Sequence, residues 1–159
     1  MIRIGTAFDA HRLVPDRPLI LGGITIPHHK GLLGHSDADV LAHVIMDAIL
    51  GALALGSIGD FFPDTDPQFE GADSMQLLTQ VQHTMADQGF SIVNMDTTIV
   101  AQSPKLAPYI LDIRNSIATC MGVSLGQVSV KATTTERMGY EGTEEGISAH
   151  AAVLLSLTP

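Results

Sequence analysis

The sequence predicts the α/β (α+β) class: one domain over residues 1–159, in which a mixed β-sheet packs with three main helices. The length of 159 residues suits a single domain with one hydrophobic core. Strand-like and helix-like segments alternate along the chain, and no repeat, low-complexity tract or linker separates them. Apolar residues make up 45% of the chain, so we also expect part of the apolar surface to be buried between subunits.

The first half is expected to form a strand, a hairpin and a long helix. Apolar and polar residues alternate over 2–9, which indicates a strand. "PLILGGITIP" indicates a hairpin with Gly22 and Gly23 as its turn. A helix is expected over 38–55, with Ser36 or Asp37 as the N-cap. The Gly/Pro/Asp-rich segment 56–72 is expected to be an irregular loop, and loops of this length are usually functional or disordered.

The second half is expected to alternate helices and strands. A helix over 74–88 is predicted to start after Asp73 and to stop at Gly89. A strand follows over 90–102, and a third helix within 103–122 ends at Gly122. The strand predicted over 127–136 runs out into hydroxyl groups and an acid. The last segment, 146–157, is apolar on both faces, so we expect it at the centre of the sheet or against another subunit.

Charge and composition exclude several classes of protein. The net charge is -9, with 17 acidic residues against 8 Lys and Arg, so no nucleic-acid partner is expected. No apolar run approaches the roughly 20 residues of a membrane helix, so no membrane partner is expected either. A single cysteine, Cys120, suits a reducing cytoplasm. The start at "MIRIG", with no leader-like segment, favours a bacterial cytoplasm over a plastid.

Three residues suggest a metal site. Asp9 and His11 are two apart on a predicted strand, so their side chains point to the same face. By itself this pair is more typical of an Asp–His hydrogen bond. His43 lies in the first long helix, where Asp39 and Asp47, one turn away on either side, are expected to accept from its ring. A carboxylate and two imidazoles match a catalytic zinc site with one open position. Spacing alone leaves both readings open.

Several other groups suit an anionic ligand, although each also has a simpler interpretation. His35 and Ser36 precede the predicted helix, and helix N-termini attract anions. Asp64 and Asp66 could hold magnesium, but in a Pro/Asp loop such acids usually belong to turns. Lys105 alone reads as a surface residue. Residues 133–136, three threonines and a glutamate, lie where a strand ends and resemble a ligand-binding edge, although threonine also suits strands.

Taken together, the motifs resemble one enzyme family. They are "FDAH", "GLLGHSDADVLAH", "IGDFFPDTDPQFEGADS", "AQSPKL" and "VKATTTERMGYEGTEEGI", in this order over almost the whole chain. In them the chain is similar to the 2-C-methyl-D-erythritol 2,4-cyclodiphosphate synthases of non-mevalonate isoprenoid biosynthesis. The resemblance implies a homotrimer with active sites between subunits.

The resemblance also implies roles for individual residues. It implies that Zn²⁺ is bound by Asp9, His11 and His43, and that Glu136 helps to hold a second divalent ion, Mg²⁺ or Mn²⁺. It implies that His35 and Thr134 stabilise the transition state. The implied substrate-binding residues are Asp9, His11, His35, Ser36, Ser57, Ile58, Gly59, Phe62, Pro63, Asp64, Thr65, Asp66, Ala101, Gln102, Ser103, Pro104, Lys105, Leu106, Ala107, Thr133, Thr134, Thr135, Glu136 and Tyr140.

The implied reaction is a metal-assisted cyclisation by a phosphorus–oxygen lyase. The 2-phosphate of 4-diphosphocytidyl-2-C-methyl-D-erythritol 2-phosphate attacks the β-phosphate of the same molecule, forming the cyclic diphosphate and releasing cytidine monophosphate. We expect neither a general base nor a covalent intermediate, because the attacking phosphate is already an anion. Binding a multiply charged anion to an acidic protein requires divalent cations, and the acids recruit them.

The chain departs from the family pattern at two positions, and two other functions remain as alternatives to the synthase. Ser57 stands where the family usually has an aspartate that contacts a substrate hydroxyl, so the charge at that contact is lost. Thr143 stands where many members have an arginine that lines the trimer cavity, so we do not expect an isoprenoid diphosphate to bind there in the same way. The alternatives are a metal-dependent phosphohydrolase and a non-enzymatic trimeric metal- or nucleotide-binding module.

Overall fold

The computed structural model describes residues 1–158. Its main sheet has the strand order β4-β1-β7-β5-β6, formed by β1 (Ile2–Pro15), β4 (Lys30–Leu32), β5 (Phe90–Val100), β6 (Val128–Thr133) and β7 (Gly146–Leu157). All neighbours in this sheet are antiparallel except β5 and β6, which are parallel. A separate hairpin consists of β2 (Leu19–Leu21) and β3 (Ile24–Ile26). The predicted mixed α/β class and the central position of the last strand are confirmed.

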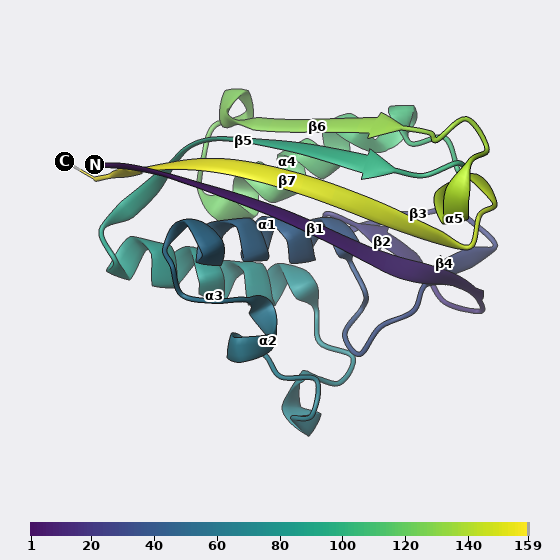
Figure 1. Cartoon of the computed structure of the whole chain (residues 1–159), viewed down its shortest axis with the longest axis horizontal. Coiled ribbons are helices and arrows are strands. Elements are labelled where there is room, and N and C mark those ends of the chain that lie inside the picture. The colour runs from purple at the N-terminus through teal and green to yellow at the C-terminus, as the bar shows by residue number, and fades with distance from the viewer. Residues whose placement is uncertain (159) are drawn as a thin grey trace.

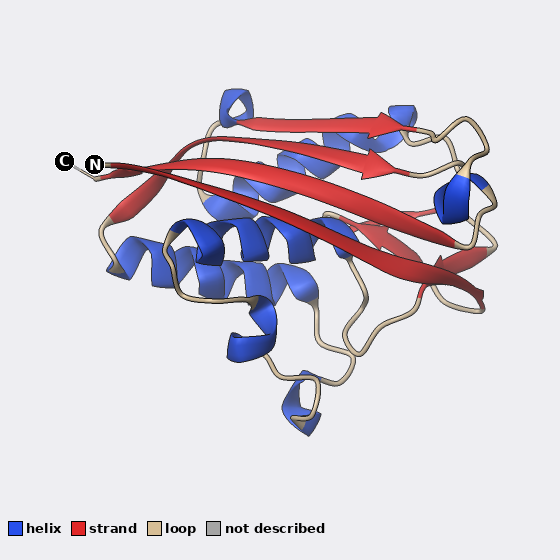
Figure 2. Cartoon of the chain, viewed as in Figure 1, coloured by secondary structure: helices blue, strands red, loops and turns tan. Residues whose placement is uncertain are grey.

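Helices cover one face of the sheet (Figures 1 and 2). The three main ones are α1 (Val40–Ala52), α3 (Ser74–Asp87) and α4 (Ile110–Met121). Helix α1 packs against β1 and β7, α4 packs against β6, and α3 packs against both helices. Short elements are α2 (Ile58–Phe61), α5 (Gly139–Gly142), η1 (Pro67–Phe69), η2 (Ala107–Tyr109) and η3 (Leu125–Gln127). Among the described residues, no helix combines the length and apolar character needed to cross a membrane.

Strand β1 is longer than the predicted strand over 2–9, because it continues to Pro15. Its inward-facing positions at Asp9 and His11 are polar, and this interrupts the alternation that marks a half-buried strand. The opposite face of the strand carries Ile2 and Ile4, each 70% exposed, and Phe8, 55% exposed. The sheet therefore has one face packed on helices and an outer face that this chain leaves uncovered, with exposed apolar side chains along β1.

The start of α1 differs from the prediction. Its N-cap is Asp39, not Ser36 or Asp37. The fully buried Asp39 carboxylate accepts hydrogen bonds from the backbone N–H of Ala42 at 3.1 Å, Gly22 at 2.9 Å and Gly23 at 2.7 Å. The two glycines have φ of 58° and 77°, as the tight turn of the predicted hairpin requires. One carboxylate therefore satisfies both a helix start and a hairpin turn.

The other predicted boundaries agree closely, with one exception. Asp73 caps α3, and Gly122 ends α4 in a left-handed conformation. The segment 56–72 is not wholly irregular, because it contains α2 and η1. Ser57 and Asp60 form a capping box at α2, and the Asp66 side chain accepts from Gln68 N–H at the start of η1. Local capping by acids and hydroxyls thus orders a segment whose glycines and prolines predict a loop.

The contact between α1 and β1 depends on Gly5. A Cβ added at Gly5 would overlap the carbonyl oxygen of Ala48 and lie 2.8 Å from Ala52 N, both on α1. We expect Gly5→Ala to lower the free energy of unfolding by about 1–3 kcal/mol, because two backbones would have to separate. Urea denaturation measures this change.

Gly51→Ala is the matched control, because Gly51 lies on α1 with nothing within 4 Å of an added Cβ. It should raise stability by up to about 1 kcal/mol, since alanine is the better helix former. Equal stabilities of the two variants would contradict the close approach at Gly5.

Asp39→Asn should lower the free energy of unfolding by about 1–3 kcal/mol, because a single amide oxygen cannot replace two carboxylate oxygens that accept from three N–H donors, two of them in buried hydrogen bonds. Thermal or urea unfolding checks this. The exposed Asp16→Asn serves as the control and should leave stability unchanged. A wild-type-like Asp39→Asn would show that the shared cap contributes little.

Candidate functional site

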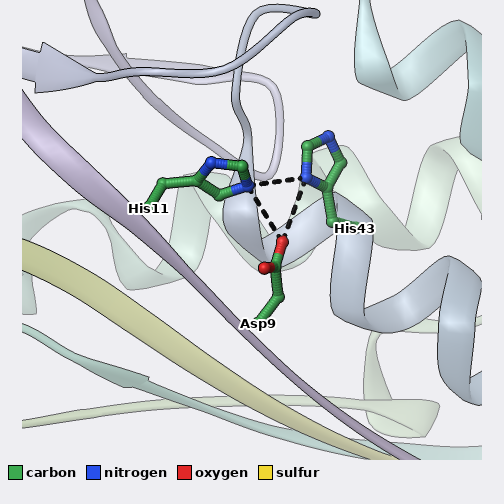
Figure 3. Close-up of side chains that lie close together, drawn as sticks. All are labelled: Asp9, His11 and His43. Carbon is green, nitrogen blue, oxygen red and sulfur yellow. Dashed lines mark hydrogen bonds and ion pairs between the residues drawn. The ribbon is translucent and has the colours of Figure 1, made fainter. Parts of the chain in front are cut away.

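Asp9, His11 and His43 converge on one point, although 32 residues separate the two histidines. Asp9 Oδ2 lies 2.9 Å from His11 Nε2 and 3.2 Å from His43 Nδ1, and the two ring nitrogens are 3.1 Å apart. Asp9 and His11 project from the inner face of β1, and His43 projects from the first turn of α1 toward them (Figure 3). The tertiary structure thus brings together the three residues predicted as metal ligands.

The cluster suits a divalent metal. In the described chain these three residues form the group of His, Cys, Asp and Glu that could hold an ion, each offering one ligand atom. Ligands about 2.1 Å from a tetrahedral zinc lie roughly 3.4 Å apart, and the observed separations of 2.9–3.2 Å are close to this. Two nitrogens and one carboxylate oxygen form the ligand set of catalytic zinc, which keeps its fourth position open.

The electrostatics of the cluster also favour a cation. Burial tends to raise the pKa of the Asp9 carboxyl, but hydrogen bonds and charge interactions with His11 and His43 outweigh burial, so its pKa lies well below the ordinary value. Burial tends to lower the pKa of His11, but the hydrogen bond to Asp9, the charge of Asp9 and the hydrogen bond to Leu33 together outweigh burial and raise that pKa. The carboxylate therefore stays ionised, and its negative charge beside two ring nitrogens favours a cation at this point.

The outer nitrogens of both rings have definite partners. His11 Nδ1 donates to the carbonyl oxygen of Leu33 at 2.9 Å, which leaves Nε2 facing Asp9. His43 Nε2 lies 3.1 Å from Ser74 Oγ and 3.2 Å from Ser36 Oγ.

The expectation that Asp39 and Asp47 accept from His43 is wrong. Asp39 is used in capping α1 and the hairpin, and Asp47 accepts from Ile58 N–H at 2.7 Å. Hydroxyl groups take the place expected for carboxylates: Ser36 comes from the loop before α1, and Ser74 comes from the start of α3.

The cluster opens into a cavity of about 360 Å³, which we call the metal cavity. Nine predicted site residues line it: Asp9, His11, His35, Ser36, His43, Ile58, Gly59, Phe62 and Asp64. Met46, Phe69 and Leu77 complete the lining. Sequence reasoning missed Met46 and Leu77 because apolar residues at helical spacing look like ordinary core, and it missed Phe69 because Phe69 lies in a segment predicted as an irregular loop. The segment around α2 and η1 therefore forms the wall opposite β1.

A second cavity of about 350 Å³ lies where β5 and β6 end, and we call it the sheet-end cavity. Its predicted members are Ala101, Gln102, Pro104, Lys105, Leu106, Ala107, Thr133 and Thr134. Ile110 and Ala132 line it as well and were not predicted. The two cavities share no lining residue, so within this chain the two sets of predicted residues are brought to separate places.

The remaining predicted residues line neither cavity. They are Ser57, Pro63, Thr65, Asp66, Ser103, Thr135, Glu136 and Tyr140. Ser57 Oγ donates to Asp60 at 3.1 Å, and Asp66 caps η1 outside the metal cavity, whereas Asp64 lines that cavity. Glu136 is exposed and accepts from Thr134 Oγ1 at 3.1 Å. Tyr140 lines a small pocket of about 150 Å³ that also includes His11.

The chain is similar over almost its whole length to proteins of one family. The model of the YgbB family matches residues 2–156. A protein from Trichlorobacter lovleyi named 2-C-methyl-D-erythritol 2,4-cyclodiphosphate synthase is 59% identical, over 97% of this chain and 98% of the relative.

Solved structures agree. The bifunctional IspDF of Campylobacter jejuni superimposes with a TM-score of 0.95 at 43% identity, over 99% of this chain; the chain spans 42% of that longer protein. The CDP complex of IspF from Plasmodium falciparum superimposes with a TM-score of 0.88 at 32% identity, over 99% of this chain and 97% of that one. The family model and the relatives match almost the entire chain, and the solved structures agree in fold. The chain therefore belongs to the YgbB family.

Proposed function

We propose that the chain, as one cyclodiphosphate-synthase domain over residues 1–159, converts 4-diphosphocytidyl-2-C-methyl-D-erythritol 2-phosphate to 2-C-methyl-D-erythritol 2,4-cyclodiphosphate and cytidine monophosphate. The observation that carries the proposal is the Asp9–His11–His43 cluster at the wall of a cavity, in a member of a family whose relatives bear this enzyme's name. The reaction is a lyase step in isoprenoid precursor biosynthesis.

Asp9, His11 and His43 would hold zinc in the metal cavity, with Nε2 of His11 and Nδ1 of His43 facing the ion. Bound zinc would supply positive charge that offsets the phosphate oxygens and orients them. The chain's own residues then position the substrate. His35 and Ser36 lie on the lining, where an imidazole and a hydroxyl meet a phosphate. Phe62, Phe69 and Met46 contribute apolar surface to the same lining.

The reaction needs positioning more than proton transfer. The attacking 2-phosphate and the β-phosphate belong to one molecule and repel each other, so the site must bring two anions into line. Lys105 in the sheet-end cavity supplies positive charge to the diphosphate. Glu136, with Thr134 donating to it, is proposed to help hold Mg²⁺ or Mn²⁺ at the same diphosphate. Thr134 and His35 are proposed to stabilise the transition state.

The cytidine diphosphate portion is assigned to the sheet-end cavity of a neighbouring subunit. In the strand order, β7 and β5 lie between β1 and β6. At about 4.8 Å per strand step, β1 and β6 are roughly 14 Å apart, and the two cavities share no residue. A homotrimer that covers the exposed apolar face at Ile2, Ile4 and Phe8 would place one subunit's sheet end beside the next subunit's metal cavity.

Two residues set this chain apart from the family pattern described above. Ser57 is engaged with Asp60 in the capping box of α2, so its hydroxyl is shared between helix capping and any sugar contact. Thr143 donates to Glu145 at 2.8 Å and provides no cation for a diphosphate in a trimer cavity. A bacterial cytoplasmic setting is proposed from the similarity to the protein of Trichlorobacter lovleyi.

Phosphorus NMR with this substrate, Zn²⁺ and Mg²⁺ tests the reaction. Wild type should form the cyclic diphosphate and cytidine monophosphate. His43→Ala should reduce the rate more than about a hundredfold, because loss even of a residue that only supports a ligand costs up to that factor. His83→Ala, an exposed histidine on α3, is the matched control and should keep full activity.

The products separate the alternatives. Linear hydrolysis products from wild type would favour the phosphohydrolase, and tight nucleotide or metal binding without turnover would favour the binding module. Product formation by His43→Ala at the wild-type rate would retain the reaction and contradict the metal assignment.

Subunit mixing tests the shared site. His43→Ala and Lys105→Glu should each be nearly inactive, because one lacks a metal ligand and the other places an acid in the sheet-end cavity. Unfolding them together and refolding should restore roughly a quarter of wild-type activity, since a site is intact when one subunit supplies the metal residues and its neighbour supplies the lysine.

The control mixture, His43→Ala with Asp9→Ala, should recover nothing, because both changes affect the same cavity. Absence of recovery in the first mixture would place the whole site within one subunit.

A further inference from the structure

Ser74 is a buried hydroxyl that the proposed reaction does not use. It is fully buried at the first residue of α3, and its Oγ lies 3.1 Å from Nε2 of His43. The same Oγ donates to Asp37 Oδ1 at 2.5 Å. The backbone N–H of Ser74 donates to Asp37 Oδ2 at 3.1 Å, so both carboxylate oxygens are engaged by one residue.

The direction of these hydrogen bonds follows from the inventory of donors. An ionised carboxylate only accepts, so the Ser74 hydroxyl must give its single proton to Asp37. Ser74 Oγ then faces His43 with lone pairs alone. A favourable contact at 3.1 Å requires His43 to carry its proton on Nε2. In the neutral ring, which is the form that binds a metal, Nδ1 then keeps its lone pair, and Nδ1 is the nitrogen that faces Asp9 and His11.

Ser36 does not determine which ring nitrogen of His43 carries the proton. Its Oγ lies 3.2 Å from His43 Nε2 and 3.3 Å from Ser74 Oγ, and it accepts from Ala38 N–H at 3.2 Å. No carboxylate holds the Ser36 proton among these contacts, so this hydroxyl is free to donate to the ring or to accept from it. Asp37 is what distinguishes the two serines.

The contact between Asp37 and Ser74 joins the loop before α1 to the start of α3. Asp37 N–H donates to the carbonyl of Ala72 at 3.0 Å, and Gly71 N–H donates to the carbonyl of His35 at 2.8 Å. The segment that carries His35 and Ser36 is thus held against the residues that place Ser74. The loop before α1 and the start of α3 therefore meet at Nε2 of His43.

We propose that Asp37 and Ser74 form a positioning pair that fixes the tautomer and ring orientation of His43, so that Nδ1 is presented to the metal. This inference rests on the proposed metal centre. Neither residue touches substrate in the proposal; both act through His43. Partners of this kind typically contribute a factor of about 10–100 in metal affinity.

The first measurement is the zinc dissociation constant, by competition with a chromogenic chelator. Ser74→Ala should weaken zinc binding by about 10–100-fold, because the ring loses the one hydroxyl partner that can only accept, and the remaining Ser36 hydroxyl can equally donate to Nε2. Asp37→Asn should weaken it too, because an amide can turn its NH₂ toward Ser74 and so let the serine donate to Nε2. Ser74→Thr keeps the hydroxyl and should restore affinity toward the wild-type value.

Ser148→Ala is the matched control. Ser148 is also fully buried and also donates its hydroxyl to a carboxylate, Glu141 Oε1 at 2.7 Å, but it has no contact with His43. Its zinc affinity should equal that of wild type. An equal loss in Ser148→Ala and Ser74→Ala would show a general effect of buried serines and would overturn the proposal.

A second readout follows the proton itself. In zinc-loaded protein, the Nε2 proton of His43 should give a ¹H–¹⁵N signal protected from solvent exchange, and Ser74→Ala should lose that protection. A merely structural role of Ser74 would leave the signal unchanged, and that result would overturn the proposal.

The outcomes separate this inference from the proposed function. If wild type binds no zinc, the metal centre fails and the pair has nothing to position. If wild type binds zinc and Ser74→Ala binds it equally well, only the positioning pair is wrong.

Discussion

The structure depends on how closely helix α1 lies against strand β1. Gly5 permits the two backbones to approach, and α1 is buried along almost its whole length. That closeness carries His43 to within 3.2 Å of Asp9 and 3.1 Å of His11. The buried carboxylate of Asp39 secures the arrangement by capping α1 and binding the hairpin turn with one side chain. A shift of α1 by even one ångström would separate the cluster, because metal ligands tolerate little change in distance.

Charge explains why such a cluster occurs in this chain. The protein carries a net charge of -9, yet its proposed substrate is itself a multiply charged anion. Acidic side chains cannot attract phosphates, but they recruit cations that do. Asp9 stays ionised because two imidazoles face it, and the same rings offer nitrogen ligands to a metal. The hydroxyls around His43 then serve a different purpose from the acids: they hold a ring and add no charge.

The placement of the two cavities gives the proposed assembly its physical logic. The metal cavity forms between β1, α1 and the segment around α2, whereas the sheet-end cavity forms beyond β5 and β6. Strands β7 and β5 separate them within one chain. The apolar outer face of β1 has no cover in this chain, and burying it against further copies would stabilise the assembly and combine the two cavities. Stability and catalysis would then depend on the same interface.

The sequence by itself determined the order and type of the main elements, because periodicity and most caps are local signals. The Gly22-Gly23 turn, Asp73 before α3 and Gly122 after α4 are each recognised from a few neighbouring residues. Strand geometry alone put Asp9 and His11 on one face, and the motifs pointed to the family. Only the tertiary structure decided that Asp39 rather than Ser36 or Asp37 caps α1, and that Ser74 rather than Asp39 or Asp47 meets His43. The reason is distance along the chain: Ser74 lies 31 residues from His43 and Gly22 lies 17 from Asp39, so no local pattern records their contact.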